Sequence, residues 1–447
     1  MNKKTGVRNM LHKNKLIIAG LVVVMILTMS FAAAAKTAKS ISLGDDFSAL
    51  EGVDSFNANP AGLIERDKNW VFVSDSYGGA WGNFIASSGD DIDLNEAFDI
   101  IEDENLALGM NTAFGSSMYY KSFGAGANIN IQGIAYSDFE TFDFVLNRGA
   151  IDLGDDIDVL EMNIDSIGGK GAAYADAAVS YGFSLSDERL ASLNKNRDSE
   201  INDINFGLTG HYLQGAIFEL RTDIEEFKVR TLESNNQNPY YYMGGETERE
   251  IYALNSEGAN ATGYAFDLGM NMRVNDKYQF AFSVMNIGEM KDDDIRKNGE
   301  KIVLTGKTET IDSEKYYNEF DDSSDNTIED EAYDGSLSYT LPRTIRLGGS
   351  MDYNEDITLY GDYANVSYDG LDDSENKFGL GAEARWLKIL PLRMGLNYST
   401  LRKDIEIPVG LGIHFSSYKV DLGFNDLGAL WNSNKGLSFG VSSRLEF

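Results

Sequence analysis

The last residues of the chain, Gly436 to Phe447, read GLSFGVSSRLEF, and this stretch decides between two fold classes. Side chains alternate between the two faces of an extended strand, so one face of this strand is apolar and the other is polar. The apolar face carries Leu437, Phe439, Val441, Leu445 and Phe447. Such a strand fits an edge of a soluble β-sandwich, or a β-barrel whose apolar face meets lipid and whose polar face lines a wet lumen.

The same alternation recurs upstream. From Gly263 to Arg273 apolar and polar or small residues alternate without a fault, and Lys277 to Ile287 repeats the pattern after the turn signal Asn275-Asp276. Other segments are expected to be strands: Asn69–Tyr77, Met118–Tyr136 as one hairpin, Ala172–Ser184, Ile204–Leu213, Ala216–Val229, Arg343–Tyr353, Ile357–Val366, Lys377–Trp386, Leu392–Ser399, Val409–Phe415 and Tyr418–Asn425.

Three features favour the barrel over the sandwich. The segments run about 9–11 residues, the length of a tilted strand that crosses a bilayer. Short turns alternate with long connections, and Tyr264, Tyr353, Trp386 and Tyr398 near strand ends resemble the aromatic girdles of membrane proteins. The sequence therefore predicts an all-β fold, a transmembrane antiparallel β-barrel of about 14 strands, with about 16 as the neighbouring even number.

Ionised or polar side chains recur on the second face of these strands, where a lumen is expected. Pairing of acids with bases inside the wet lumen is favoured over steering of a polar solute. The predicted lumen-facing residues are Asp267, Arg273, Arg346, Asp352, Asp362, Glu383, Arg385, Arg393, His414, Asp421 and Arg444.

The N-terminus has the pattern of an export signal. A basic stretch precedes the apolar run Leu16–Phe31, and Ala33-Ala34-Ala35 is the best cleavage site. We expect a cleaved signal peptide over residues 1–35, with an uncleaved anchor helix as the alternative. Residues 36–68 are expected to form a hatch, and residues 69–447 the outer-membrane barrel.

Composition excludes several function classes. The formal net charge is −33, and loss of the basic leader would leave about −38, which argues against binding to nucleic acid. There is no cysteine, and hence no disulfide and no thiolate metal site.

No phosphate loop, dinucleotide fingerprint or zinc spacing occurs in the sequence, so we expect no cofactor, no metal site and no catalytic residues. A hydrolase built on His211 or His414 is a distant alternative, because neither lies near a nucleophile motif.

The stretch Ser48 to Ile64, SALEGVDSFNANPAGLI, resembles the start of the FadL-type outer-membrane transporters. The tripeptide Asn59, Pro60 and Ala61, followed by Gly62 and Leu63, carries most of this resemblance. The C-terminal third is also similar to this superfamily and to its PorV-like relatives, in the patterns Ile345-Arg346-Leu347-Gly348, Gly381-Ala382-Glu383 and Leu392-Arg393-Met394-Gly395-Leu396.

The resemblance implies a 14-stranded barrel plugged by its N-terminus, with Asn59, Pro60, Ala61, Gly62 and Leu63 in the plug. It also implies passive uptake of hydrophobic or amphipathic small molecules of the long-chain fatty-acid type, with outer-membrane lipid around the barrel. An ordinary periplasmic turn is the alternative for the plug. PorV-like members serve protein secretion, so a barrel that docks a secretion or surface partner is the alternative function.

Long acidic loops are expected between strands, above all Gly288–Gly335 and the polar stretch Arg230–Asn260. A docked partner would bind to the first of these loops. The acidic run from Asp321 to Glu331 has oxygen ligands that Ca²⁺ prefers, but a solvated loop is favoured because no EF-hand spacing is present. A short helix is expected within Asp93–Asn111.

Overall fold

The computed structural model describes residues 36–44, 47–64, 70–86, 106–137, 159–162, 168–195, 199–224, 227–232, 240–243, 245–306, 327–371, 374–415, 417–427 and 434–447. The signal-peptide prediction for residues 1–35 lies outside these residues. Among the helices of the described chain, none has the length and apolar character needed to cross a membrane.

A large antiparallel sheet of 19 strands dominates the described residues. Its first half is β1(Val71–Ala86), β2(Leu106–Tyr120), β3(Phe123–Ser137), β5(Gly168–Ser184), β6(Ile201–Ile224), β9(Gly245–Ser256), β10(Ala261–Val274), β11(Tyr278–Asp292) and β12(Ile295–Gly306). Its second half is β13(Thr327–Tyr333), β14(Leu337–Thr340), β15(Arg343–Asp352), β16(Ile357–Ser367), β17(Glu375–Ala384), β18(Leu392–Ser399), β19(Asp404–Glu406), β20(Val409–Phe415), β21(Tyr418–Phe424) and β22(Asn434–Glu446).

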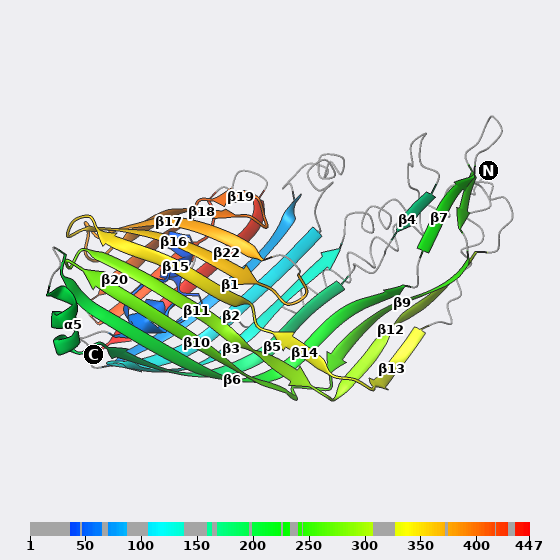
Figure 1. Cartoon of the computed structure of the whole chain (residues 1–447), viewed down its shortest axis with the longest axis horizontal. Helices are drawn as coiled ribbons and strands as arrows, with labels where there is room; N and C mark the ends of the chain where they lie inside the picture. The colour runs from blue at the N-terminus through cyan, green and yellow to red at the C-terminus, as the bar shows by residue number, and fades with distance from the viewer. Residues whose placement is uncertain are drawn as a thin grey trace.

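The sheet closes on itself, because the first strand pairs with the last. β1 and β22 are antiparallel from Val71 opposite Glu446 to Trp81 opposite Gly436. Several strands are consecutive pieces of one interrupted strand, since β6 pairs with both β9 and β10, and β11 pairs with both β14 and β15. Counted this way, the 19 described strands form a closed barrel of 14 strands, which confirms the predicted fold class and strand number (Figure 1).

The outer face of the barrel is an apolar belt. Along β10 burial alternates residue by residue, with Tyr264, Phe266 and Leu268 exposed and Ala265 and Asp267 buried. In the C-terminal strand Leu437, Phe439 and Phe447 are likewise exposed. A soluble protein does not leave so large an apolar surface uncovered, whereas a barrel in a bilayer presents it to lipid.

The two ends of the barrel differ. At the end that holds the C-terminus, the strands are joined by short connections such as Lys121–Ser122, Asn275–Lys277 and Asn354–Asp356. Trp70 at this end packs on Tyr120 in a tilted arrangement, with ring centroids 4.7 Å apart. Tyr353 and Trp386 lie in turns of the same end and are more than 60% exposed, as expected for an interfacial girdle.

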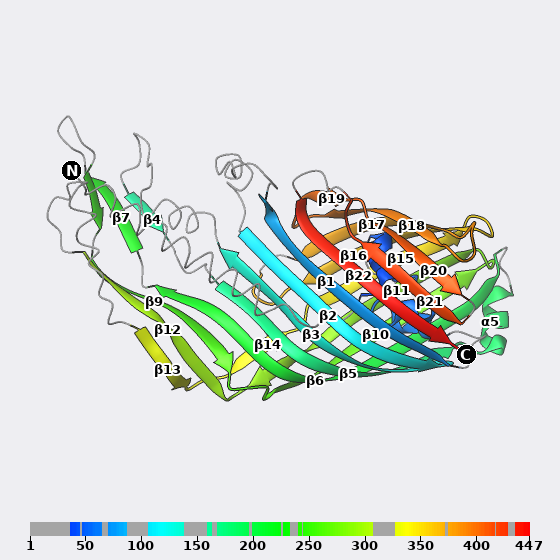
Figure 2. The same cartoon turned by 180° about the vertical axis from the view of Figure 1, so that it is seen from behind.

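The other end extends well beyond the rest of the barrel on one side. β6 has 24 residues, and β9, β12 and β13 continue the sheet past the ends of the C-terminal strands (Figures 1 and 2). The predicted acidic loop Gly288–Gly335 is therefore wrong over its described part, which consists of the end of β11 together with β12 and β13. Residues 307–326 of that stretch, with most of the acidic run considered for Ca²⁺, lie outside the described residues.

Two other local predictions are wrong. The predicted loop Arg230–Asn260 contains β9, and the strand pair expected over Ile204–Val229 is one continuous strand, β6, up to Ile224. The missed parts continue the sheet by backbone pairing, as in the pairing of β9 with β6 and with β12. Residues 106–111 of the stretch in which a helix was expected belong to β2, and residues 93–105 lie outside the described residues.

Two smaller elements complete the fold. Helix α5(Asp187–Asn194) lies between β5 and β6. A separate sheet contains β4(Val159–Met162), β7(Phe227–Leu232) and β8(Tyr240–Met243), in the order β4-β7-β8.

The N-terminal segment, residues 36–64, is buried against the inner side of the barrel wall. It consists of α2(Ala38–Leu43) and the 3₁₀ turns η1(Gly52–Ser55) and η2(Pro60–Leu63), nearly all of whose residues are buried. α2 packs on β17, β18 and β20–β22, whereas η2 packs on β5, β6 and β10. The segment therefore spans the width of the lumen.

Leu268→Arg tests the lipid-facing assignment. Leu268 is 48% exposed on the outer face of β10, so a charge there should lower the free energy of unfolding in lipid vesicles by about 2–4 kcal/mol. Leu193→Arg is the matched control, because Leu193 is exposed on α5, outside the barrel strands. Urea unfolding in vesicles measures both, and equal effects of the two substitutions would contradict the assignment.

Candidate functional site

The Asn-Pro-Ala-Gly-Leu stretch forms a compact turn at the inner wall. Asn59 caps η2 by accepting a hydrogen bond from the N–H of Ala61, at 3.0 Å. Its Nδ2 donates to the carbonyl oxygens of Ser48 at 2.9 Å and Met270 at 3.1 Å. Pro60 has no N–H and a fixed φ, which suits the first position of such a turn. Asn59 thus joins two parts of the N-terminal segment to strand β10.

Glycine residues on the barrel wall allow this turn to pack closely against the strands. Gly207 on β6 and Gly269 on β10 are directly opposite each other in register. A Cβ atom on Gly207 would lie 2.2 Å from the carbonyl carbon of Pro60, and one on Gly269 would lie 1.9 Å from Asn59 Oδ1. Only glycine at these two positions allows the turn to approach the backbone so closely. α2 meets a similar surface, since a Cβ atom on Gly395 would lie 2.0 Å from the Leu43 carbonyl oxygen.

A cluster of buried charges lies on the inner face of the C-terminal strands. Arg393 donates from Nε to Glu383 Oε2 at 2.7 Å and from Nη1 to Asp421 Oδ1 at 2.6 Å. His414 Nε2 lies 3.0 Å from the same Asp421 oxygen. These four predicted lumen residues come from β17, β18, β20 and β21, and the barrel brings them together as paired acids and bases.

The N-terminal segment is bound to this cluster by charge. Lys39 Nζ lies 3.4 Å from Glu383 Oε2, and Asp54 pairs with Arg444 of β22. Burial alone would lower the pKa of Lys39, but Glu383, Tyr360 and Asp54 outweigh it and raise that pKa above its ordinary value. Lys39 therefore stays charged at neutral pH and holds α2 to the wall.

Two more predicted residues bind the segment at other points. Asp362 of β16 accepts hydrogen bonds from the backbone N–H of Ser48, at 2.8 Å, and from the Ser48 hydroxyl. Arg273 of β10 pairs with Glu51. Polar contacts thus join the segment to several strands around the barrel.

The remaining predicted lumen residues make other contacts. Asp352 accepts a hydrogen bond from the Thr358 hydroxyl at 2.8 Å, and Arg385 donates to the same hydroxyl at 2.7 Å. Arg385 has a side chain that is 47% exposed, near the short-turn end. Arg346 is buried and lines a central cavity with Asp267.

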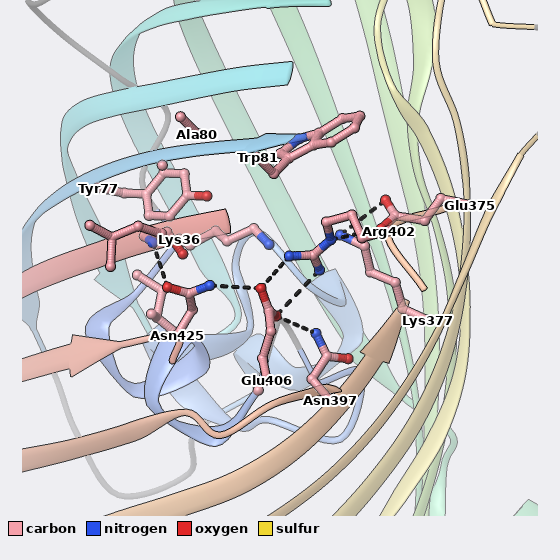
Figure 3. Close-up of a pocket in the computed structure, with 15 residues that line it drawn as sticks. Lys36, Tyr77, Ala80, Trp81, Glu375, Lys377, Asn397, Arg402, Glu406 and Asn425 are labelled. Atoms are coloured by element: carbon pink, nitrogen blue, oxygen red, sulfur yellow. Dashed lines mark hydrogen bonds and ion pairs between the residues drawn. The ribbon is translucent and has the colours of Figure 1, made fainter. Parts of the chain in front are cut away.

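A second polar cluster lines a pocket of about 60 Å³ at the long-connection end of the lumen (Figure 3). Arg402 lies between Glu406 and Glu375, with Nε 3.6 Å from Glu375 Oε1. Asn425 Nδ2 donates to Glu406 Oε1 at 2.8 Å. Sequence patterns did not single out this cluster, because Arg402 follows a strand in a turn where no alternation marks its direction.

A cavity of about 190 Å³ occupies the lumen next to the N-terminal segment. His211 of β6 lies on its wall, with Nδ1 3.0 Å from Asp176 Oδ2 and Nε2 2.8 Å from Asp267 Oδ2. Both ring nitrogens face carboxylates, so the geometry fits an imidazolium paired on two sides. Asp176 was missed from the sequence, although the exposed Val179 and Tyr181 on the same strand already fix its inward direction.

The described residues offer no cluster of three or more His, Asp or Glu side chains suited to a metal ion. The two histidines of the barrel contact carboxylates. The arrangement joins the N-terminal segment to the inner wall by hydrogen bonds and ion pairs.

A sequence model for a family described as "Family of unknown function (DUF5723)" matches residues 73–424. No curated protein matches the chain at the sequence level.

Solved structures with a similar fold include transporters and channels. The toluene transporter TbuX of Ralstonia pickettii has 11% identity and a TM-score of 0.48, with 93% of this chain and 99% of that chain covered. A deletion mutant of the monoaromatic hydrocarbon channel TodX has 13% identity, a TM-score of 0.49, and coverage of 93% and 100%. A FadL homologue of Pseudomonas aeruginosa has 10% identity, a TM-score of 0.45, and coverage of 93% and 99%. With TM-scores below 0.5, these similarities carry no weight for substrate or mechanism.

Arg393→Ala tests the buried charge cluster. Removal of this side chain leaves Glu383 and Asp421 buried without their main partner, so we expect the free energy of unfolding to fall by about 3–5 kcal/mol. Lys291→Ala is the control, because Lys291 pairs with Glu289 in the exposed part of β11 and should leave the unfolding midpoint unchanged. A midpoint that is equally unmoved by Arg393→Ala would show that the cluster is not stabilising.

Proposed function

This chain belongs to the DUF5723 family of unknown function, and we propose that it is an outer-membrane barrel that carries hydrophobic or amphipathic small molecules by passive diffusion past its N-terminal segment. The observation that carries the proposal is the buried N-terminal segment inside a closed barrel. In this proposal residues 36–68 are the hatch, and Asn59, Pro60, Ala61, Gly62 and Leu63 form the turn that holds it against the wall.

The lumen is suited to a solute with both apolar and polar surface. The central cavity is lined by aromatic and aliphatic side chains, among them Trp81, Met285 and Tyr339, and by polar side chains such as Asn130 and Asp267. Ligand sites commonly combine a mostly apolar lining with a few placed polar groups.

The hatch must shift or rearrange for a solute to pass, because α2 and η2 contact opposite parts of the wall. The contacts between the hatch and the barrel wall are of types that can break together when the hatch moves. They are hydrogen bonds, ion pairs and close backbone approaches to glycine, with small apolar clusters such as that of Leu43, Phe47 and Leu50. Passage by diffusion needs only that the segment leave one side of the wall.

The alternative function, a barrel that docks a secretion or surface partner, is not supported by the described part of the predicted acidic loop. It was based on Gly288–Gly335, whose described residues include the end of β11 together with β12 and β13. Membership in a secretion complex is therefore not proposed.

Gly207→Leu tests whether the segment controls passage. A leucine at this position would collide with Pro60, and overpacking of about 1–3 kcal/mol should displace the turn and raise uptake about 5-fold or more. The measurement is uptake of a labelled acylcarnitine, a zwitterionic amphiphile that crosses bare lipid slowly, into vesicles that contain the protein.

Gly210→Leu is the matched control on the same strand, because a Cβ atom there meets nothing closer than 4.0 Å. It should leave uptake at the level of the unchanged chain. The transport proposal fails if neither the intact protein, nor Gly207→Leu, nor a deletion of residues 41–67 passes the amphiphile faster than protein-free vesicles.

A further inference from the structure

The central cavity has one wall made of side-chain amides. On β3 Asn128, Asn130 and Gln132 occupy alternate positions, and Ile129 between them is 49% exposed on the lipid face. All three amides therefore point inward and line the cavity. Asn111 of β2 lies opposite Gln132 in register and adds a fourth amide from the neighbouring strand.

Two of these amides have unused hydrogen-bonding atoms. Asn130 is only 2% exposed, and its Nδ2 donates to no group of the described chain. The Oδ1 atom of Asn111 likewise accepts no hydrogen bond from the described residues. Because an unsatisfied buried polar atom costs about 1–3 kcal/mol, a donor and an acceptor left open on adjacent strands indicate a ligand group that both accepts and donates. A hydroxyl group has this property.

Several charged groups around the cavity are already paired. His211 is held between Asp176 and Asp267, Lys170 lies 3.1 Å from Asp369, and Lys377 pairs with a glutamate of β17. A charged ligand would have to compete with these partners, whereas a neutral one uses the open amide atoms. The cavity therefore favours an uncharged ligand.

Aromatic rings form another part of the lining. The Trp81 and Tyr368 rings have centroids 5.6 Å apart, and Tyr77, Tyr174 and Tyr339 lie around the same cavity. The faces of aromatic rings are electron-rich and attract positively polarised C–H groups. A saturated ring with hydroxyl groups at its rim offers such C–H groups on its faces, and the volume of about 190 Å³ suits a molecule of about one ring.

We propose that this cavity binds a neutral polyhydroxylated ring of the hexopyranose type, either free or as the head of an amphipathic glycoside. The amides of Asn111 and Asn130 hold its hydroxyl groups, and the aromatic side chains cover its C–H faces. The assignment names the substrate class of the transport route and so rests on the proposed function.

Calorimetric titration of the intact protein in a detergent without a sugar head group tests this assignment. The probes are the methyl glycosides of glucose, galactose and mannose, with cyclohexanol as a ring of similar size that has one hydroxyl group. At least one glycoside should bind saturably and cyclohexanol should not, because a site built for hydroxyl groups discriminates strongly against their loss.

Asn130→Ala and Asn111→Ala should each weaken glycoside binding about 10-fold or more, since each removes a hydrogen-bonding partner of the ligand. Gln279→Ala is the matched control. Gln279 is also a buried amide with an open nitrogen, but it does not line the cavity, so binding should be unchanged. The two separate asparagine variants keep the test decisive if one of them fails to fold.

The assignment is overturned if no glycoside binds, if cyclohexanol binds as well as the glycosides, or if affinity survives both asparagine substitutions. These results are separable from those of the transport assay. Uptake of the acylcarnitine without glycoside binding would leave the transport function standing and remove the sugar site. Glycoside binding by a barrel that passes no solute would support the site and contradict transport.

Discussion

Backbone hydrogen bonding in lipid is the constraint on which this structure depends. A strand with an apolar outer face has no water there to satisfy its N–H and C=O groups, so each strand must have a neighbour on both sides. The pairing of β1 with β22 meets this requirement by closing the sheet, from Val71 opposite Glu446 to Trp81 opposite Gly436. Where the sheet extends beyond the apolar belt, at β9, β12 and β13, the requirement is relaxed and the wall no longer closes around the lumen (Figure 1).

Closure with 14 strands creates a lumen that the side chains of the wall cannot fill by themselves. The N-terminal segment occupies part of this space, and it does so through contacts that suit a polar interior. Lys39 reaches Glu383, Asp54 reaches Arg444, and Asn59 bonds to the backbone of Met270. The amide- and aromatic-lined cavity lies next to this segment. The barrel thus combines a buried N-terminal segment with a cavity beside it, and the proposed transport function rests on these two features.

The lipid-facing side chains could be predicted from the sequence, because they depend only on the alternation of apolar and polar residues along each strand. Alternation along Gly263–Arg273 fixes which side chains meet lipid, whatever strand lies next to them. The inward contacts could not be predicted, since Lys39 meets Glu383 only through strand order and register. The strands of the extended end were missed because their residues do not alternate as the lipid-facing strands do. Ile295–Gly306 has backbone pairing along β9 but no apolar face, so its sequence has the composition of a loop.

A disulfide cross-link tests most directly whether the N-terminal segment lies inside the barrel. The chain has no cysteine, so the double variant Leu43→Cys/Gly381→Cys has a single possible intramolecular pair. A Cβ atom on Gly381 would lie 3.2 Å from Leu43 Cβ, close to the separation that disulfides span. Oxidation of the folded protein in vesicles should produce a species of faster mobility on a non-reducing denaturing gel, while Leu43→Cys/Gly210→Cys should not. A folded barrel in which Leu43→Cys/Gly381→Cys fails to cross-link would contradict this structure of the lumen.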